Sequence, residues 1–277
     1  MIMIFDCETI LDIDLIKAGF KQEFLEKGLE LESLSELEIS QYALEIQKEL
    51  SGSAFLPVCY HCVVSIAAVI CDEFGNFIKV GNFKSSGDCK EEREKSLLQD
   101  FFKFFNQKQP KLVSYNGRGF DIPMLLLRAM KHRLNAVAYF EDNNPQFNKN
   151  KWENYRQRYS ERFHTDLLDS LSNFGAVRGL KLDILANLVG FPGKYDTSGD
   201  MVLELYYKNE LEKINEYCQS DVLNTYGLYL NYELLRGNLT KDDYYKILEN
   251  WRDLLPQEAE YYQVFYDKIT NLLESRG

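Results

Sequence analysis

Two acidic residues two positions apart, Asp6 and Glu8, lie in the largely apolar N-terminal stretch MIMIFDCETI. Residues 2–5 predict a buried β-strand, and alternate side chains of a strand share a face. Asp6 and Glu8 therefore point to one side and Cys7 to the other. Neighbouring carboxylates repel each other unless a positive partner is present. Oxygen ligands of this kind suit Mg²⁺ or Mn²⁺, although the same spacing also arises at strand ends that face solvent.

Two further segments carry acids that could join this pair. Asp121, in SYNGRGFDIPMLLL, lies where a predicted strand meets a helix that begins at Pro123. It could be a metal ligand or an ordinary carboxylate at a helix start. Tyr217 and Asp221 are four residues apart in a predicted helix, so the phenol and the carboxylate share one face.

The pattern of elements predicts helices around an early sheet. Residues 62–71 and 77–83 predict two more strands around the turn signal DEFGN, which together with residues 2–5 suggests an antiparallel meander. KLVSYNG predicts a further strand, and Thr240 is a predicted helix N-cap. This order indicates α/β layering. Predicted helices lie near residues 90–106, 123–134, 181–190, 201–209, 210–235 and 240–251, and after Pro256.

The acidic motifs together resemble those of a known family. Asp6-Cys7-Glu8, NGRGFD (116–121) and Tyr217-x-x-x-Asp221 follow the order of the three exonuclease motifs of the DEDD superfamily, in its tyrosine-bearing branch. The chain most resembles predicted 3'-5' exonucleases related to the proofreading domain of family B DNA polymerases. The resemblance extends over about residues 2–232 and includes FLPVCYHCVVSIAAV and FHTDLLDSL. The histidine-bearing branch is disfavoured because the three histidines lie outside NEYCQSD.

The resemblance implies a ribonuclease H-like fold, an α/β structure with a mixed five-stranded sheet flanked by helices. We expect residues 1–232 to form this exonuclease domain. A Glu-rich helical insertion at about residues 12–52 follows the first strand and has no expected direct role in chemistry. Residues 233–277 form a helical C-terminal extension that packs on the domain or on a partner.

The resemblance also implies roles for the acidic residues. Asp6, Glu8, Asp121 and Asp221 would bind two divalent ions, Mg²⁺ or Mn²⁺, about 4 Å apart, for hydrolysis of a phosphodiester. Tyr217 would orient the attacking water, since a phenol with a pKa near 10 is a poor base at neutral pH. The implied activity is metal-dependent 3'-5' exonucleolytic cleavage at the 3' end of single-stranded nucleic acid.

Three neighbouring residues have alternative interpretations. Asp166 falls where the family has an acid near the site, so it could contact a metal directly or through water, or it could be a strand-end acid or helix cap. Asn116 could position the Asp121 loop or touch the terminal nucleotide. Phe120 could wedge against a base, but a place in the core is the favoured alternative.

A basic and aromatic segment at residues 144–164 is a candidate for substrate binding. Arginines such as Arg156 and Arg158 can follow phosphates, while the interleaved aromatic rings stack on unpaired bases. The alternative is an amphipathic helix with buried aromatic rings and solvated basic residues. The segment interleaves Phe147, Trp152, Tyr155, Tyr159 and Phe163 with Lys149, Lys151, Arg156, Arg158 and Arg162.

Charge is segregated along the chain. The net charge of −11 and the pI near 4.9 argue against a protein that coats nucleic acid through bulk electrostatics. Residues 103–195 nevertheless carry fifteen Lys or Arg and eight Asp or Glu, a net charge of +7. This local excess suggests that a strand end is threaded into a site. DNA is favoured by the polymerase-like resemblance; a 3'-5' exoribonuclease and a catalytically silent ribonuclease H-like binding module are the alternatives.

The cysteines and the apolar runs indicate the compartment. Six cysteines show no framework-like spacing, and no pattern of a secretory leader precedes them. The longest apolar stretch, residues 63–71, is far shorter than the roughly 20 residues that span a bilayer. We therefore expect reduced thiols, a cytoplasmic location and no contact with membranes.

Overall fold

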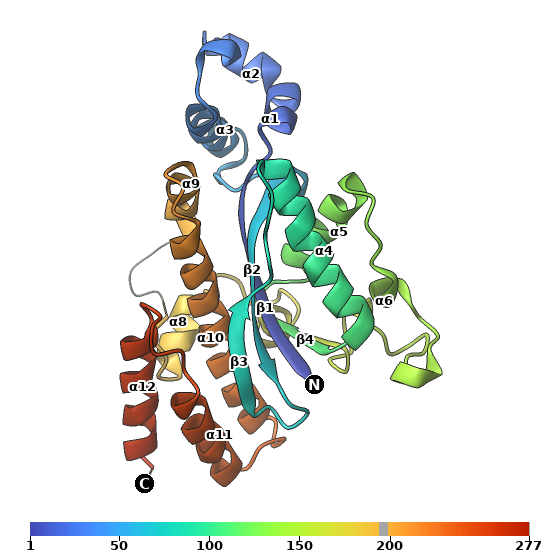
Figure 1. The fold of residues 1–277 in the computed structure, drawn as a ribbon, viewed down its shortest axis with the longest axis vertical. Coiled ribbons are helices and arrows are strands. Elements are labelled where there is room, and N and C mark those ends of the chain that lie inside the picture. Colours follow the sequence, from blue (N-terminus) through green and yellow to red (C-terminus); the bar gives the residue numbers. More distant parts are fainter. Residues whose placement is uncertain (194–198, 277) are drawn as a thin grey trace.

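The computed structural model describes residues 1–193 and 199–276, and a five-stranded β-sheet lies at its centre (Figure 1). The strands are β1 (Ile2–Leu11), β2 (His61–Cys71), β3 (Phe77–Asn82), β4 (Lys111–Ser114) and β5 (His164–Asp166). Their order in the sheet is β3-β2-β1-β4-β5. The first three strands pair antiparallel, whereas β4 is parallel to β1 and β5 to β4. The predicted mixed sheet with an N-terminal meander is confirmed.

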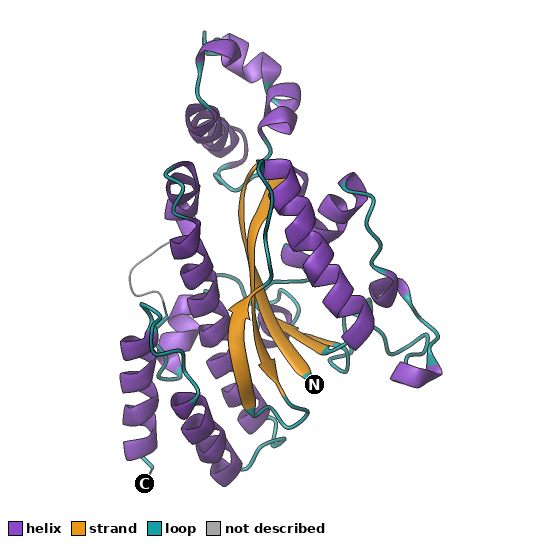
Figure 2. Cartoon of the chain, in the orientation of Figure 1, coloured by secondary structure: helices purple, strands orange, loops and turns teal. Residues whose placement is uncertain are grey.

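Helices cover both faces of this sheet (Figure 2). They are α1 (Ile13–Gly19), α2 (Lys21–Glu26), α3 (Glu36–Ser51), α4 (Lys90–Lys108), α5 (Asp121–Lys131), α6 (Val137–Phe140), α7 (Leu167–Leu171), α8 (Leu182–Leu188), α9 (Gly199–Tyr207), α10 (Leu211–Leu235), α11 (Lys241–Asp253) and α12 (Tyr262–Glu274). Short 3₁₀ helices are η1 (Leu31–Ser33), η2 (Val58–Tyr60) and η3 (Pro145–Phe147). In Figure 1, α4 to α6 lie on one side of the sheet and α8 to α12 on the other.

The central strand β1 is buried on both faces, which explains its nearly unbroken apolar sequence. Ile4 belongs to the core shared with α10, α11 and α12, whereas Phe5 belongs to the core shared with α4 and α5. Asp6 and Glu8 continue the alternation of Ile4, because side chains two residues apart share a face. The two acids therefore point toward the α10 layer.

A β-bulge interrupts the pairing of β1 with β2 beside the acidic pair. Glu8 lies opposite Ser65 and Thr9 opposite Val63, so β2 contains one extra residue at this point. The backbone N–H of Val63 donates to Glu94 on α4 at 3.0 Å. Bulges redirect side chains and increase local twist. A buried carboxylate thus stabilises the irregular backbone next to Glu8.

A buried ionic network joins this bulge to α5. The guanidinium of Arg128 donates to Glu94 at 2.6 Å and to Asp12, just after β1, at 2.6 Å. His132 contacts Glu94 at 2.8 Å, and Lys131 donates to Asp12 at 3.1 Å. Arg128, Glu94 and Asp12 are almost fully buried. Their mutual pairing compensates for the cost of removing three charges from water.

The segment between β1 and β2 forms the expected helical lobe, which extends from one end of the sheet (Figure 1). Phe24 and Ile39 belong to its own small core. Helix α3 begins with a capping box, in which Ser35 and Glu38 satisfy each other's backbone N–H groups. It ends at Gly52, which adopts the left-handed conformation that glycine tolerates.

The C-terminal helices α11 and α12 pack against α10 and complete the core on that face. Thr240 caps α11 by accepting a hydrogen bond from the N–H of Asp243 at 3.1 Å, as predicted. Trp251 is completely buried, with its ring 4.7 Å from Tyr226 and 5.2 Å from Phe191 between ring centroids. The extension therefore belongs to the same hydrophobic core as the sheet.

Candidate active site

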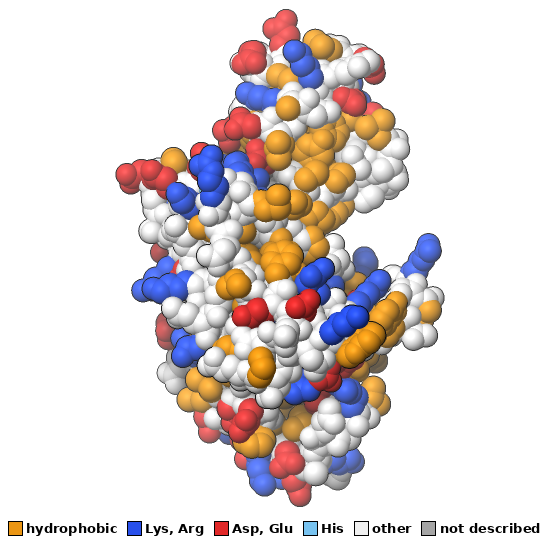
Figure 3. Space-filling view, turned by 90° about the vertical axis from the view of Figure 1, so that its right-hand side faces the viewer, with side chains coloured by type: hydrophobic (Ala, Val, Ile, Leu, Met, Phe, Trp, Pro, Cys, Tyr) orange, Lys and Arg blue, Asp and Glu red, His pale blue; other side chains and the backbone are white. Residues whose placement is uncertain are grey.

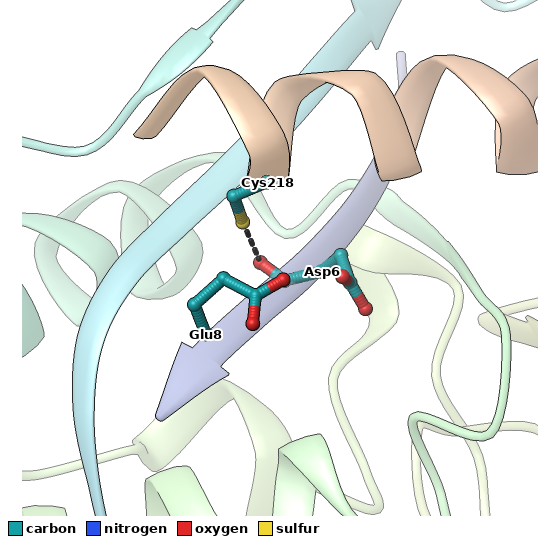
Figure 4. Close-up of side chains that lie close together, drawn as sticks. All are labelled: Asp6, Glu8 and Cys218. Carbon is teal, nitrogen blue, oxygen red and sulfur yellow. Dashed lines mark hydrogen bonds between the residues drawn. The ribbon is translucent and has the colours of Figure 1, made fainter. Parts of the chain in front are cut away.

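Asp6 and Glu8 point from β1 toward α10, where they meet Cys218 (Figure 4). A carboxylate oxygen of each acid and the sulfur of Cys218 lie within 4.8 Å of one another. The Cys218 thiol donates to the backbone carbonyl of Asp6 at 3.5 Å. Burial raises the pKa of Cys218 well above its ordinary range, so the thiol stays protonated and the carboxylates supply the charge. The sequence does not predict the place of Cys218 beside the acidic pair, because nothing there distinguishes it from the other apolar positions of the helix.

Helix α10 contributes Tyr217 and Asp221 to the same region. The Tyr217 hydroxyl hydrogen-bonds to the Asp221 carboxylate, so the predicted sharing of one helical face is confirmed. Tyr217 is almost fully buried and packs in a cluster with Ile10 of β1 and Val64 of β2. The position of the phenol is therefore fixed from three elements.

Asp121 is the first residue of α5 and is buried at the end of a tight loop. Within the loop, Asn116 has a φ of 66°. A Cβ atom at Gly117 would lie 2.4 Å from the Ser114 hydroxyl, so only glycine fits without a shift. The Asp121 carboxylate accepts hydrogen bonds from the backbone and the thiol of Cys7 on β1. These contacts bring the start of α5 against the centre of the sheet.

The carboxylates of three elements act on one another electrostatically. Burial raises the pKa of Asp6 well above its ordinary range. The neighbouring charges of Asp121, Glu8 and Asp221 raise this pKa further. Burial also raises the pKa of Asp121 to about 7. The structure thus brings together β1, α5 and α10, because such charge effects fade over a distance of roughly 10 Å.

This donor set fits hard divalent cations. Carboxylate oxygens are the preferred ligands of Mg²⁺ and Mn²⁺, and the protonated Cys218 thiol is not a competing soft ligand. A buried group of like charges is stabilised either by protons or by bound cations. The raised pKa values of Asp6 and Asp121 mean that, without bound cations, these carboxyl groups hold protons more readily.

Asp166 adopts the helix-cap arrangement. Its carboxylate accepts hydrogen bonds from the N–H groups of Leu168 and Asp169 at the start of α7, at 3.1 and 3.4 Å. It also accepts from the N–H groups of Asn116 and Arg118, at 2.9 and 2.8 Å. Burial raises the pKa of Asp166, and these backbone hydrogen bonds act in the opposite direction. Asp166 therefore anchors the loop that leads to Asp121.

Phe120 lies between the site and an aromatic group at the start of β2. The centroid of its half-buried ring lies 5.0 Å from those of Phe55 and His61. Phe55 is 58% exposed, so this group opens to solvent. The prediction that Phe120 lies in the core is therefore only partly confirmed, because its side chain is half-buried. Asn116, at the other end of the loop, is exposed.

The basic and aromatic segment 144–164 is irregular, so the amphipathic-helix alternative is wrong. Before β5 begins at His164, its only regular elements are η3 and two isolated bridges, Asn144 to Lys149 and Asn150 to Glu153. The side chain of Asn144 accepts from the N–H of Gln146, and that of Asn150 from the N–H of Trp152. Such local side-chain hydrogen bonds compete with helix formation.

The aromatic rings of this segment divide into two groups. Tyr155 and Phe163 are buried in the core beside α4, as the alternative of buried rings expected. Trp152 and Tyr159 are exposed, at 74% and 77%. On the face that carries α4 to α6, basic and exposed apolar side chains lie next to one another, and hydrophobic side chains gather below the α1–α3 lobe (Figure 3).

The two candidate arginines are already in contact with other side chains. The guanidinium of Arg156 lies 5.7 Å from the ring centroid of Phe140. Arg158 donates two hydrogen bonds to Asp169, at 2.9 and 2.6 Å. Both contacts orient the charged groups near the protein surface.

Arg118 has a structural role that the sequence does not reveal. Its guanidinium donates to the backbone carbonyls of Tyr155, Gln157 and His164, at 2.9, 3.2 and 2.9 Å. This side chain ties segment 144–164 to the loop before Asp121. In the sequence NGRGFD, Arg118 looks like an ordinary surface arginine. The one feature that could have indicated its structural role is its position in a glycine-rich turn.

The family model for predicted 3'-5' exonucleases related to the exonuclease domain of PolB matches residues 53–269. The chain belongs to this family. No curated protein matches the sequence. The exonuclease match continues beyond residue 232, the limit expected from the motifs, and it starts after Asp6 and Glu8. Its C-terminal reach is understandable because α11 and α12 share one core with α10 and the sheet.

Membership in the exonuclease family and the mixed sheet together confirm the ribonuclease H-like α/β fold. The family supports nuclease activity on nucleic acid, which exonucleases generally perform with divalent metal ions. No helix within residues 1–193 or 199–276 has the length and apolar character needed to cross a bilayer.

Proposed function

We propose that this protein is a metal-dependent 3'-5' exonuclease that hydrolyses phosphodiester bonds at the 3' end of single-stranded nucleic acid, with DNA favoured. One observation carries the proposal: carboxylate oxygens of Asp6 and Glu8 lie within 4.8 Å of each other, and, besides burial, the nearby charges of Asp121 and Asp221 raise the pKa of Asp6. Acids far apart in the sequence therefore converge in one buried region. The relation of the family to the exonuclease domain of PolB favours DNA.

The metal-binding residues are Asp6, Glu8, Asp121 and Asp221, which would hold two Mg²⁺ or Mn²⁺ ions. When bound, the ions activate the attacking water and stabilise the leaving oxygen of the phosphodiester. The chain supplies the rigid frame for these ligands, from a strand, a helix start and the middle of a long helix. Asp166, with its carboxylate on four backbone N–H groups, acts indirectly by holding the Asp121 loop.

Tyr217 orients the attacking water. Burial and the neighbouring Asp221 and Glu8 charges raise the pKa of its phenol, so the hydroxyl remains protonated at neutral pH. A protonated phenol is not a base; it donates its one hydrogen to Asp221, and its oxygen would accept a hydrogen bond from the attacking water. Its hydrogen bond to Asp221 fixes the direction of the oxygen toward the acidic group.

The substrate contacts lie around the same loop. Asn116 and Phe120 flank the turn before Asp121 and would contact the terminal nucleotide. Arg156 and Arg158 would bind phosphates of the incoming strand. All four residues belong to segments that Arg118 connects by hydrogen bonds to backbone carbonyls.

The test is degradation of 5'-labelled single-stranded DNA and RNA oligonucleotides with Mg²⁺, Mn²⁺ or EDTA. We expect stepwise shortening from the 3' end with metal, none in EDTA, and none with Asp6→Ala or Asp221→Ala. Asp253→Ala, which alters an exposed acid on α11, is the matched control and should retain activity.

Each other outcome has a defined meaning. Cleavage in EDTA, or full activity of Asp6→Ala, would contradict the metal-dependent mechanism. Degradation of RNA but not of DNA would identify a 3'-5' exoribonuclease. Binding of both oligonucleotides without cleavage in any metal would identify a catalytically silent binding module.

A further inference from the structure

Two aromatic side chains from different segments form an exposed pair on the surface. The ring centroids of Tyr159 and Phe174 lie 4.7 Å apart in an edge-to-face arrangement. Tyr159 is 77% exposed and Phe174 37% exposed, so both rings contact solvent. The guanidinium of Arg158 lies 5.9 Å from the Phe174 ring, and its ion pair with Asp169 holds it there. Adjacent exposed rings present flat π faces on which unpaired bases can stack.

The backbone under Phe174 is strained. Asn173 and Phe174 have φ values of 50° and 55°, a left-handed region that residues with bulky side chains rarely adopt. The conformation is held by hydrogen bonds from the N–H of Phe174 to Asp169 at 2.7 Å and from the N–H of Val177 to Ser172 at 2.9 Å. Strain of this kind persists where surrounding contacts enforce it, often at functional sites. Here it keeps an aromatic ring at the surface.

Both halves of this pair are fixed to the loop that leads to Asp121. Arg118 donates to the carbonyls of Tyr155 and Gln157, which precede Tyr159. On the other side, Asp166 accepts hydrogen bonds both from this loop and from the start of α7, the helix that ends just before Phe174. These hydrogen bonds connect the two segments that carry the aromatic pair to the loop before Asp121.

We infer that Tyr159 and Phe174, with Arg158, form a stacking platform for nucleotides on the 5' side of the scissile bond, an inference that rests on the proposed exonuclease function. Every base presents a π face, so the platform would accept any sequence. Bases in a duplex are already stacked on their neighbours, so the platform selects single strands. The exposed guanidinium groups of Arg156 and Arg158 in the same segment are complementary to the phosphates of the strand.

The experiment compares two DNA substrates, a dinucleotide and an octanucleotide. The dinucleotide has only one nucleotide 5' of the scissile bond, whereas the octanucleotide is long enough to cross the platform. The measured quantity is the ratio of kcat/KM on the octanucleotide to kcat/KM on the dinucleotide. Tyr159→Leu and Phe174→Leu remove the π faces and keep apolar side chains. Tyr159→Phe keeps the ring, and Phe74→Leu alters a 70%-exposed ring on the β2–β3 turn.

We expect the ratio to fall at least about five-fold in each leucine variant at positions 159 and 174, since stacking of one base contributes on the order of a five-fold or greater effect. Tyr159→Phe and Phe74→Leu should keep the wild-type ratio. Fluorescence anisotropy of a labelled octanucleotide in EDTA should show the same loss of affinity without cleavage.

Several results would overturn the platform. Wild-type ratios and affinities in both leucine variants would remove Tyr159 and Phe174 from the substrate path and leave the exonuclease assignment intact. Equal losses on both substrates would place their effect in the acidic site. A wild-type protein that cleaves neither substrate with Mg²⁺ or Mn²⁺ would contradict the exonuclease function itself.

Discussion

The hydroxyl of Tyr217 hydrogen-bonds to the carboxylate of Asp221, one turn further along α10. The charges of Glu8 and Asp6 on β1 raise the pKa of the phenol. The pair therefore lies on the face of α10 that meets these two acids. Asp221 and the neutral phenol of Tyr217 are thus held together next to the acids Asp6 and Glu8. In the proposed function, the carboxylates would bind metal ions and the phenol would position the water.

Tyr217→Phe should lower kcat by roughly ten- to a hundred-fold, because the proposed metal ligands remain and the hydroxyl that would orient the water is lost. KM for an oligonucleotide should change little. Since the pKa of Tyr217 is raised, the phenol does not titrate at neutral pH, and wild-type and variant should have pH profiles of the same shape between pH 6 and 9. Steady-state kinetics across this range is the measurement; a rise of activity with pH that is present in the wild type and absent from the variant would show that the phenol acts as a base.

Asp121→Asn should stabilise the metal-free protein and abolish activity. The amide removes one buried charge that repels Asp6, and it retains the size of the side chain. We expect a gain on the order of 1 kcal/mol at pH 8, or roughly 2–4 °C in Tm. Thermal unfolding in EDTA measures this effect. An unchanged or lower Tm would mean that the carboxylates do not repel each other in the folded protein.

Metal ions should raise the Tm more at pH 8 than at pH 5.5. The folded-state pKa values of Asp6 and Asp121 are raised, so the metal-free folded protein keeps protons that the unfolded chain has released. Its stability therefore falls as the pH rises from about 4 through about 7. Bound Mg²⁺ or Mn²⁺ removes this penalty at high pH and must compete with protons at low pH. Thermal shifts with Mn²⁺ at the two pH values test this; an equal shift at both would contradict it.

Arg128→Met should destabilise the protein by about 3–5 kcal/mol, because Glu94 and Asp12 would remain buried without their main partner. Lys131→Met is the matched control. Lys131 also contacts Asp12, but its side chain is substantially exposed, so its loss should cost less than about 1 kcal/mol. Urea unfolding gives both values. Similar losses in the two variants would show that burial of the network contributes little.

Arg156→Glu and Arg158→Glu should weaken binding of a single-stranded oligonucleotide in EDTA and lower its salt dependence. Each removed phosphate contact to a single strand lowers the slope of log K against log salt concentration by about 0.7. Titrations between 50 and 200 mM NaCl measure this slope. Unchanged affinity would remove the segment 144–164 from the substrate path.

Local signals in the sequence were sufficient for most elements. The apolar run of β1, the Pro123 start of α5 and the Thr240 cap of α11 all act within a few residues, so they can be read from the sequence without the fold. Segment 144–164 was harder to predict. Its helix alternative is wrong because Asn144 and Asn150 hydrogen-bond to nearby backbone, and burial divides its rings between core and surface.

The sequence alone determined the order of the acidic motifs and, through it, the family and the residues Asp6, Glu8, Asp121 and Asp221. Only the tertiary structure decided that these acids converge, because their proximity depends on β1, α5 and α10 packing around one sheet. The tertiary structure also determined the contacts that Cys218, Arg118 and Asp166 make. Their partners are backbone groups, which no side-chain pattern in the sequence reveals.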